Sequence, residues 1–69
     1  MSIVTVDTGS RKMAGAVNFE AWKYGVEVEN LDNYQVELCC ANEEKLDLIL
    51  NKFKNVKVLH RELIKEVSW

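Results

Sequence analysis

The segment between residues 42 and 55 constrains the fold more than any other part of the chain. Four apolar residues recur in it at the i, i+3, i+4 and i+7 spacing of a single helical face: Leu46, Ile49, Leu50 and Phe53. Asn42 is a favourable N-cap residue, and Glu43 and Glu44 follow it in the first turn, where the positive end of the helix dipole favours acids. We therefore predict an α-helix over residues 43–54, with one apolar face that needs a covering layer.

Two short segments before this helix alternate apolar and polar residues, which is the period of a half-buried β-strand. Residues 26–29 form the first segment. Residues 34–40 form the second, with four side chains expected to point inward: Tyr34, Val36, Leu38 and Cys40. The Asn and Asp residues between positions 30 and 33 favour a turn, so we predict that the two strands form a hairpin.

The remaining segments are less regular. Residues 2–7 are rich in β-branched side chains and are predicted to be a strand, and residues 8–12 a turn or loop. Residues 17–21 alternate and are interpreted as a strand, the competing interpretation being a short helix capped by Asn18 and stopped by Gly25. Residues 56–58 begin a last strand; the spacing of Leu59, Leu63 and Val67 fits its continuation, which we favour, and also fits a helix.

These elements predict an α+β fold in a single domain over residues 1–69. We expect a small antiparallel sheet of four or five strands with one helix packed on one face, in the order β-β-β-β-α-β. The composition, with 48% hydrophobic and 29% charged residues, is typical of a folded globular domain. A chain of 69 residues is too short for two separate cores.

The apolar runs and the cysteines indicate a cytoplasmic protein. No run approaches the roughly 20 apolar residues that cross a bilayer, and the first residues lack the pattern of a signal peptide. Cys39 and Cys40 are adjacent, so in a strand they point to opposite faces and cannot link distant segments. Such cysteine usage suits a reducing compartment.

The string Asp7-Thr8-Gly9-Ser10, after an apolar strand, resembles the catalytic motif of aspartic proteases. Membership in that family would imply two such aspartates, from two lobes or two subunits, that together activate water, and a homodimer could supply the pair. The family also needs a longer segment before the aspartate and a later glycine-containing segment that supports the catalytic loop. The glycines here are Gly9, Gly15 and Gly25, so we interpret the string as a strand that ends in a turn at Gly9.

Other catalytic and metal-binding patterns are also missing. Cys39 or Cys40 with His60 is the only thiol and base combination in the chain, and buried packing explains the cysteines without it. Adjacent cysteines lack the spacing by which two sulfurs converge on a zinc ion. We therefore expect no enzymatic activity, no cofactor and no metal site.

The charge is unevenly distributed along the chain, although the net charge is only −2. Residues 20–47 carry a net charge of −6, whereas residues 48–69 carry +3. The basic third contains five cations: Lys52, Lys54, Lys57, Arg61 and Lys65. With Trp22, Tyr24 and Trp69 as stacking groups, a nucleic-acid-binding module is the alternative function, disfavoured by the acidic balance and the lack of a recognition motif.

The leading prediction is a small, non-enzymatic, cytoplasmic protein-binding module, an inhibitor or adaptor that occupies a surface on a larger protein. In size and layout it is similar to small phage-encoded inhibitors of host machinery. An uncovered sheet face or edge strand could instead bind a second copy of the chain. Core packing is the competing role for Trp22, and Tyr24 is expected to be exposed. The candidate binding residues are Trp22, Tyr24, Glu27, Glu29, Glu37, Leu59, Arg61 and Leu63.

Overall fold

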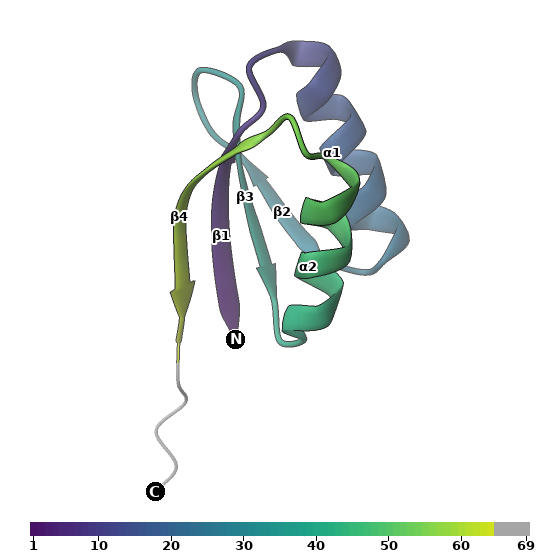
Figure 1. Ribbon diagram of the computed structural model, residues 1–69, viewed down its shortest axis with the longest axis vertical. Helices are drawn as coiled ribbons and strands as arrows, with labels where there is room; N and C mark the ends of the chain where they lie inside the picture. Colours follow the sequence, from purple (N-terminus) through teal and green to yellow (C-terminus); the bar gives the residue numbers. More distant parts are fainter. Residues whose placement is uncertain (65–69) are drawn as a thin grey trace, which may run out of the picture.

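The computed structural model describes residues 1–64 and consists of one four-stranded sheet and two helices (Figure 1). In chain order the elements are β1 (Ser2–Asp7), α1 (Arg11–Lys23), β2 (Glu27–Asn30), β3 (Gln35–Cys40), α2 (Glu43–Lys52) and β4 (Lys57–Leu63). The strands follow the spatial order β2-β3-β1-β4, and all neighbours are antiparallel. This is the split β-α-β topology of ferredoxin-like folds, which hosts many unrelated functions.

The α+β class and the four-stranded antiparallel sheet confirm the sequence prediction, but the order β-β-β-β-α-β with a single helix is wrong. The expected strand over residues 17–21 is part of α1. Val17 and Ala21 are buried at the i, i+4 spacing of one helical face, which also satisfies a period of two. Ser10, and not Asn18, is the N-cap: its hydroxyl accepts a hydrogen bond from the Met13 amide at 3.1 Å.

A glycine motif ends α1 and directs the chain into β2. The Val26 amide donates to the Ala21 carbonyl at 2.8 Å, and the Gly25 amide donates to the Trp22 carbonyl at 3.1 Å. These two bonds define a Schellman motif, in which Gly25 adopts the left-handed conformation with φ of 70°. Val26 and Ala21 are both buried, which supplies the apolar contact that accompanies the motif.

The core lies between the sheet and the two helices. Alternate residues of the central strands β1 and β3 point into it, as the period of two requires. The buried apolar residues are Val4, Val6, Val17, Ala21, Val26, Val36, Leu38, Leu46 and Ile49. Both helices pack on β3 and on each other, so they cover the same face and leave the opposite face of the sheet open.

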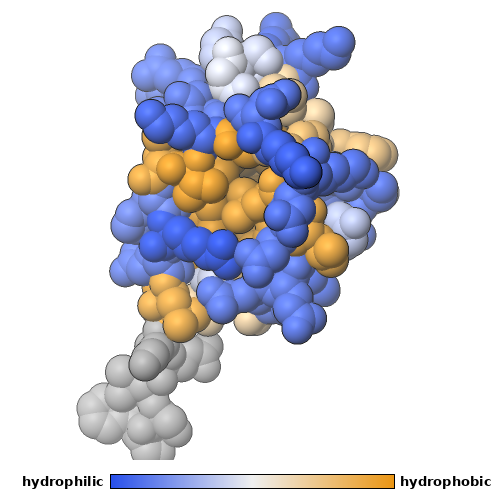
Figure 2. Space-filling view, in the orientation of Figure 1, coloured by the Kyte–Doolittle hydropathy of each residue, from blue (hydrophilic) through white to orange (hydrophobic). Residues whose placement is uncertain are grey.

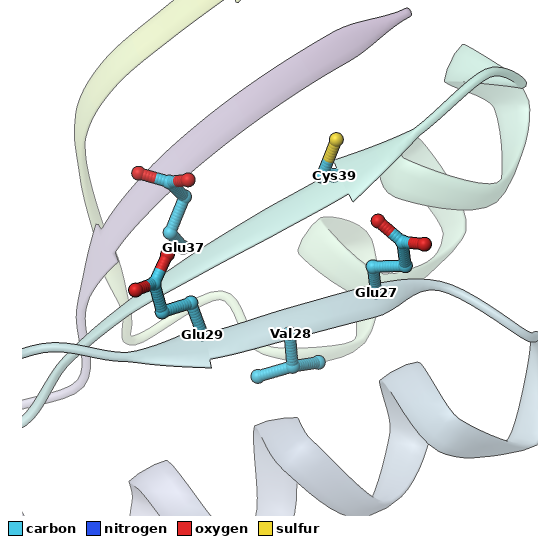
Figure 3. Close-up of a pocket in the computed structure, with 5 residues that line it drawn as sticks. All are labelled: Glu27, Val28, Glu29, Glu37 and Cys39. Carbon is cyan, nitrogen blue, oxygen red and sulfur yellow. The ribbon is translucent and has the colours of Figure 1, made fainter.

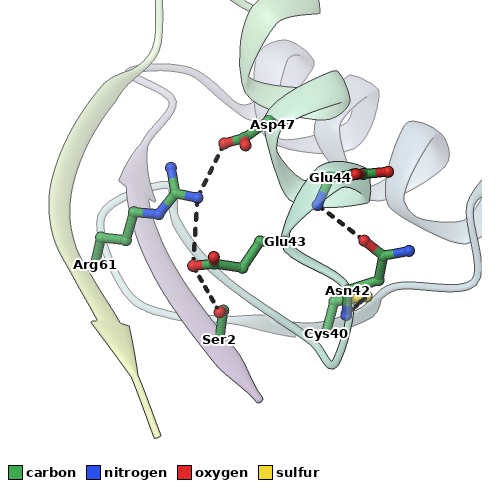
Figure 4. Close-up of polar contacts among 7 residues, drawn as sticks. All are labelled: Ser2, Cys40, Asn42, Glu43, Glu44, Asp47 and Arg61. Carbon is green, nitrogen blue, oxygen red and sulfur yellow. Dashed lines mark hydrogen bonds and ion pairs between the residues drawn. The ribbon is translucent and has the colours of Figure 1, made fainter.

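The prediction of α2 is confirmed, including its cap. The Asn42 side chain accepts a hydrogen bond from the Glu44 amide at 2.9 Å (Figure 4). Glu43 in the first turn accepts a hydrogen bond from the Ser2 hydroxyl at 3.0 Å. Arg61 reaches from β4 to Asp47 at 2.9 Å and to Glu43 at 3.8 Å, and so ties the outer strand to α2.

The predicted hairpin of β2 and β3 is also confirmed, with one difference in its turn. Asn33 and Tyr34 both adopt φ of 60°, and the turn therefore includes Tyr34 instead of leaving it in the strand. The Tyr34 side chain, expected to point inward, is 52% exposed. Val36 and Leu38 do point into the core as expected.

The ambiguous last segment is a strand over Lys57–Leu63, as favoured from the sequence; Lys65, Val67 and Trp69 lie outside the described residues. The predicted turn after β1 is confirmed at Gly9, whose φ is 75°, but Arg11 and Lys12, which are predicted to belong to it, are the first residues of α1. In the part of the chain that the structure describes, no helix is long and apolar enough to span a membrane.

Candidate functional site

The candidate binding residues lie in three places. Trp22 and Tyr24 lie at the end of α1, the three glutamates lie on β2 and β3, and the remaining candidates Leu59, Arg61 and Leu63 lie on β4. Because β2 and β4 are the two edges of the sheet, Glu27 and Glu29 lie at the edge opposite to the β4 residues, and Glu37 lies on the neighbouring strand β3. The structure therefore brings together the glutamates, but not the complete set.

Glu27, Glu29 and Glu37 form what we call the acidic face, on the side of the sheet that the helices leave open. Glu29 of β2 lies directly opposite Glu37 of β3, and Glu27 lies opposite Cys39. Figure 3 shows the three carboxylates and Cys39 projecting on the same side of the strands, whereas Val28 points towards α1. The same residues line a shallow open hollow in the surface.

The electrostatics of the acidic face are unfavourable within the chain itself. In the region covering residues 1–64, none of the three glutamates is in an ion pair. Like charges directly opposite each other on neighbouring strands destabilise a sheet, and Glu29 and Glu37 are such a pair. Partial burial and the nearby charges of Glu27 and Glu37 raise the pKa of the Cys39 thiol.

The open face continues from the acidic face across β1 to β4. Thr5 separates Glu37 from His60, and Ile3 separates Cys39 from Glu62. Cys39 and His60 are therefore two strand spacings apart and offset by two residues along the strands, a separation of roughly 12 Å. A thiol and a base at that separation cannot exchange a proton directly.

Of the two aromatic residues at the end of α1, Trp22 is exposed as its candidate binding role requires, whereas Tyr24 differs from expectation. Trp22 is 76% exposed, and its ring stacks on Phe19 with centroids 6.2 Å apart. The Lys23 ammonium lies 5.8 Å from the centre of the Phe19 ring. Tyr24, expected to be exposed, packs against the core instead. The exposed pair Phe19 and Trp22, three residues apart on one helical face, could be found from the sequence only once α1 is recognised as a helix.

The basic third of the chain is partly neutralised by internal contacts. Lys52 donates a hydrogen bond to Glu20 at 2.7 Å, and Arg61 is bound to Asp47 and Glu43 on α2. Lys65, the fifth cation of the set, lies outside the described residues. These contacts reduce the cationic charge that could bind phosphates.

The strand β4 is exposed along its whole length, including Leu59 and Leu63 at 43% and 55% exposure. Leu48 on the outer side of α2 is also exposed. Figure 2, in the same orientation as Figure 1, shows apolar side chains gathered over β4 and α2 and interrupted by hydrophilic ones.

Comparison with protein-family models, with curated proteins and with solved structures finds no match to this chain. Among residues 1–64 there is no group of three His, Cys, Asp or Glu side chains arranged to hold a metal ion. A proposal for the function therefore rests on the geometry and charge of the surfaces described above.

Proposed function

We propose that this chain is a small protein-binding module that occupies a basic surface on a larger protein. The acidic face is the contact region, and binding places cations of the partner beside Glu27, Glu29 and Glu37. The module has no catalytic role of its own. Its free cysteines, Cys39 and Cys40, suit action in the cytoplasm.

The observation that carries the proposal is the pair of glutamates directly opposite each other, Glu29 and Glu37. A neutral or basic residue at either position would make the isolated hairpin more stable, because cross-strand repulsion would be removed. A cation supplied by a partner removes the same repulsion only in the complex. The arrangement thus favours the bound state over the free state, and charge complementarity also accelerates association.

The exposed Trp22 supports the proposal as a neighbouring anchor. The helix α1 packs against β2, which is the strand that carries Glu27 and Glu29. Tryptophan is enriched among the residues that contribute most to protein interfaces, often about 2 kcal/mol or more when truncated. A partner that extends around the β2 edge of the sheet can contact both the acidic face and Trp22.

Capture from a cell lysate tests this function with a matched pair of variants. One variant carries Glu29→Lys and Glu37→Lys; the control carries Asp32→Lys and Glu44→Lys, two exposed acids away from the acidic face. Both change the net charge equally. We expect the wild type and the control to retain the same protein, and the acidic-face variant to lose it. Equal capture by all three chains would contradict the proposal.

The chemical nature of the partner surface can be tested in the same experiment. If the acidic face occupies a surface that otherwise holds nucleic acid, a polyanion such as heparin competes with the chain for the captured protein. Raising the salt concentration should weaken capture as well, because exposed charges are screened over about 8 Å at physiological ionic strength. Capture that is insensitive to both heparin and salt would exclude a basic surface.

A further inference from the structure

The strand β4 leaves an unpaired edge that is separate from the acidic face. It is the last strand in the sheet order and pairs only with β1, and all seven of its residues are exposed. An edge strand presents backbone N–H and C=O groups that can pair with another chain. The groups available to another chain are those that point away from β1.

The backbone hydrogen bonds at the end of β4 settle which groups point outward. Ile64 and Met1 exchange two bonds: the Ile64 amide donates to the Met1 carbonyl at 2.7 Å, and the Met1 amino group donates to the Ile64 carbonyl at 3.1 Å. In an antiparallel pair such bonded positions alternate with positions whose backbone groups point away. Following the register with β1, the outward groups belong to Leu63, Arg61 and Val58.

A β-bulge in β4 preserves the relation between the direction of each residue's backbone groups and the face of the sheet on which its side chain lies. His60 lies opposite Thr5 and Val58 lies opposite Val6, so Leu59 is an extra residue without a partner. As a result Val58 and Arg61 both point their backbone groups outward and their side chains to the helix-covered face. Lys57, His60 and Glu62 have their side chains on the open face.

We propose that β4 pairs antiparallel with β4 of a second copy of this chain, on a two-fold axis at His60. Leu59 remains a bulge in both copies. Val58 of the first copy and Arg61 of the second copy then exchange two backbone hydrogen bonds, and the two-fold axis repeats this pair with the copies reversed. Lys57 then lies opposite Glu62 of the second copy on the open face, and the same ion pair forms again across the axis. The two sheets join into one continuous sheet.

Charge complementarity selects a second copy as the occupant. Lys57 and Glu62 are equally distant from His60 once the bulge is counted, so a two-fold axis there places opposite charges together in both halves. These pairs occupy non-hydrogen-bonded positions, where opposing side chains approach most closely. Arg61 brings no free charge to the helix-covered side, because Asp47 and Glu43 already bind its guanidinium.

Variants that swap the charges of Lys57 and Glu62 test the proposed register, and sedimentation equilibrium measures their dimerisation. We expect the wild type to sediment with twice the mass of one chain. Lys57→Glu alone and Glu62→Lys alone each place like charges together twice, and should weaken the dimer by about tenfold. The double variant restores both ion pairs and should restore the dimer. Melting temperatures of each variant separate loss of dimer from loss of fold, since Lys57 also lies opposite Asp7.

Disulfide cross-linking tests the axis independently. In a background of Cys39→Ser and Cys40→Ala, His60→Cys would place two thiols opposite each other with Cα atoms about 4.5 Å apart, within the range of a disulfide. Glu62→Cys is the control, because its opposite residue is Lys57. We expect covalent dimers from the first variant only. A wild type that stays monomeric up to about 1 mM, or cross-linking of both variants alike, would overturn the proposal.

Discussion

Glu20 shows how a single residue joins the two helices. It is only 6% exposed, and its Oε1 atom accepts a hydrogen bond from Lys52 of α2 at 2.7 Å, with Lys23 at 3.6 Å. Its Oε2 atom is buried and has no partner within the described residues. The bond from Lys52 and the neighbouring positive charges lower the pKa of the Glu20 carboxyl, and the same bond raises the pKa of Lys52.

These shifts predict a pH window for the contribution of this pair to stability. A carboxyl with a lowered pKa stabilises the fold above its unfolded pKa, and the contribution disappears as the pH falls through the folded value, which lies below the ordinary carboxyl pKa. A lysine with a raised pKa contributes until the pH rises through its folded value, which lies above the ordinary lysine pKa. We expect Glu20→Gln to lower the melting temperature at neutral pH, and the difference from wild type to shrink in acid.

Thermal melts at a series of pH values measure this effect. Asp32→Asn is a suitable control, because Asp32 is exposed in the turn between β2 and β3 and forms no ion pair among residues 1–64. A difference between wild type and Glu20→Gln that is constant from neutral pH to acid would show that the ion pair does not contribute.

At the scale of an element, two glycines have opposite roles in α1, one within the helix and one just beyond its end. Gly25, just after the helix, has φ of 70°, whereas Gly15 lies within the helix. A Cβ atom at either position would meet nothing within 4 Å, so only the backbone conformation distinguishes them. Alanine is strained in the left-handed conformation and favoured in the right-handed helix.

Alanine substitutions at these two positions should therefore change stability in opposite directions. Gly25→Ala should lower the free energy of unfolding by about 1 kcal/mol, and Gly15→Ala should raise it by about 0.5–1 kcal/mol. Urea denaturation of the two variants measures both changes. Destabilisation by Gly15→Ala would contradict the placement of α1.

Elements were predictable where independent local signals agree. For α2 the apolar spacing, the Asn42 cap and the acidic first turn all indicate one helix, and the hairpin is marked by alternation on both sides of an Asn-rich turn. For α1 the local signals conflict, because the spacing of Val17 and Ala21 fits both a strand and a helix. The cap at Ser10 and the Schellman motif at Gly25 decide for the helix, and they depend on bonds that the sequence does not display.

The candidate site was predictable to the same extent. The common face of Glu27, Glu29 and Glu37 follows from strand alternation and a hairpin, both of which the sequence indicates. The direct opposition of Glu29 and Glu37 depends on register, which the turn at Tyr34 fixes. The exposure of Trp22 could not be inferred, because it follows from α1.

At the scale of the whole molecule, binding and stability make opposing demands on the acidic face. Glu37→Lys would replace repulsion with an attractive cross-strand pair to Glu29. We expect it to raise the free energy of unfolding by about 0.2–1 kcal/mol while it weakens capture of the partner. High salt should stabilise the wild type more than the variant, because it screens repulsion in one and attraction in the other.

Parallel melting curves and capture assays on the same preparations check this expectation. Glu44→Lys serves as the control for capture, since it makes the same change in charge at an exposed position on α2. If Glu37→Lys destabilised the fold and left capture intact, the opposing glutamates would have no role in recognition.

The two consecutive cysteines have a practical consequence. Cys39 projects on the open side of the sheet, and Cys40 packs against the core on the helical side. These two adjacent residues thus place one thiol on each face of the sheet. Comparing the alkylation rates of these neighbours, with and without a bound macromolecule, maps which side becomes shielded without introducing any foreign label.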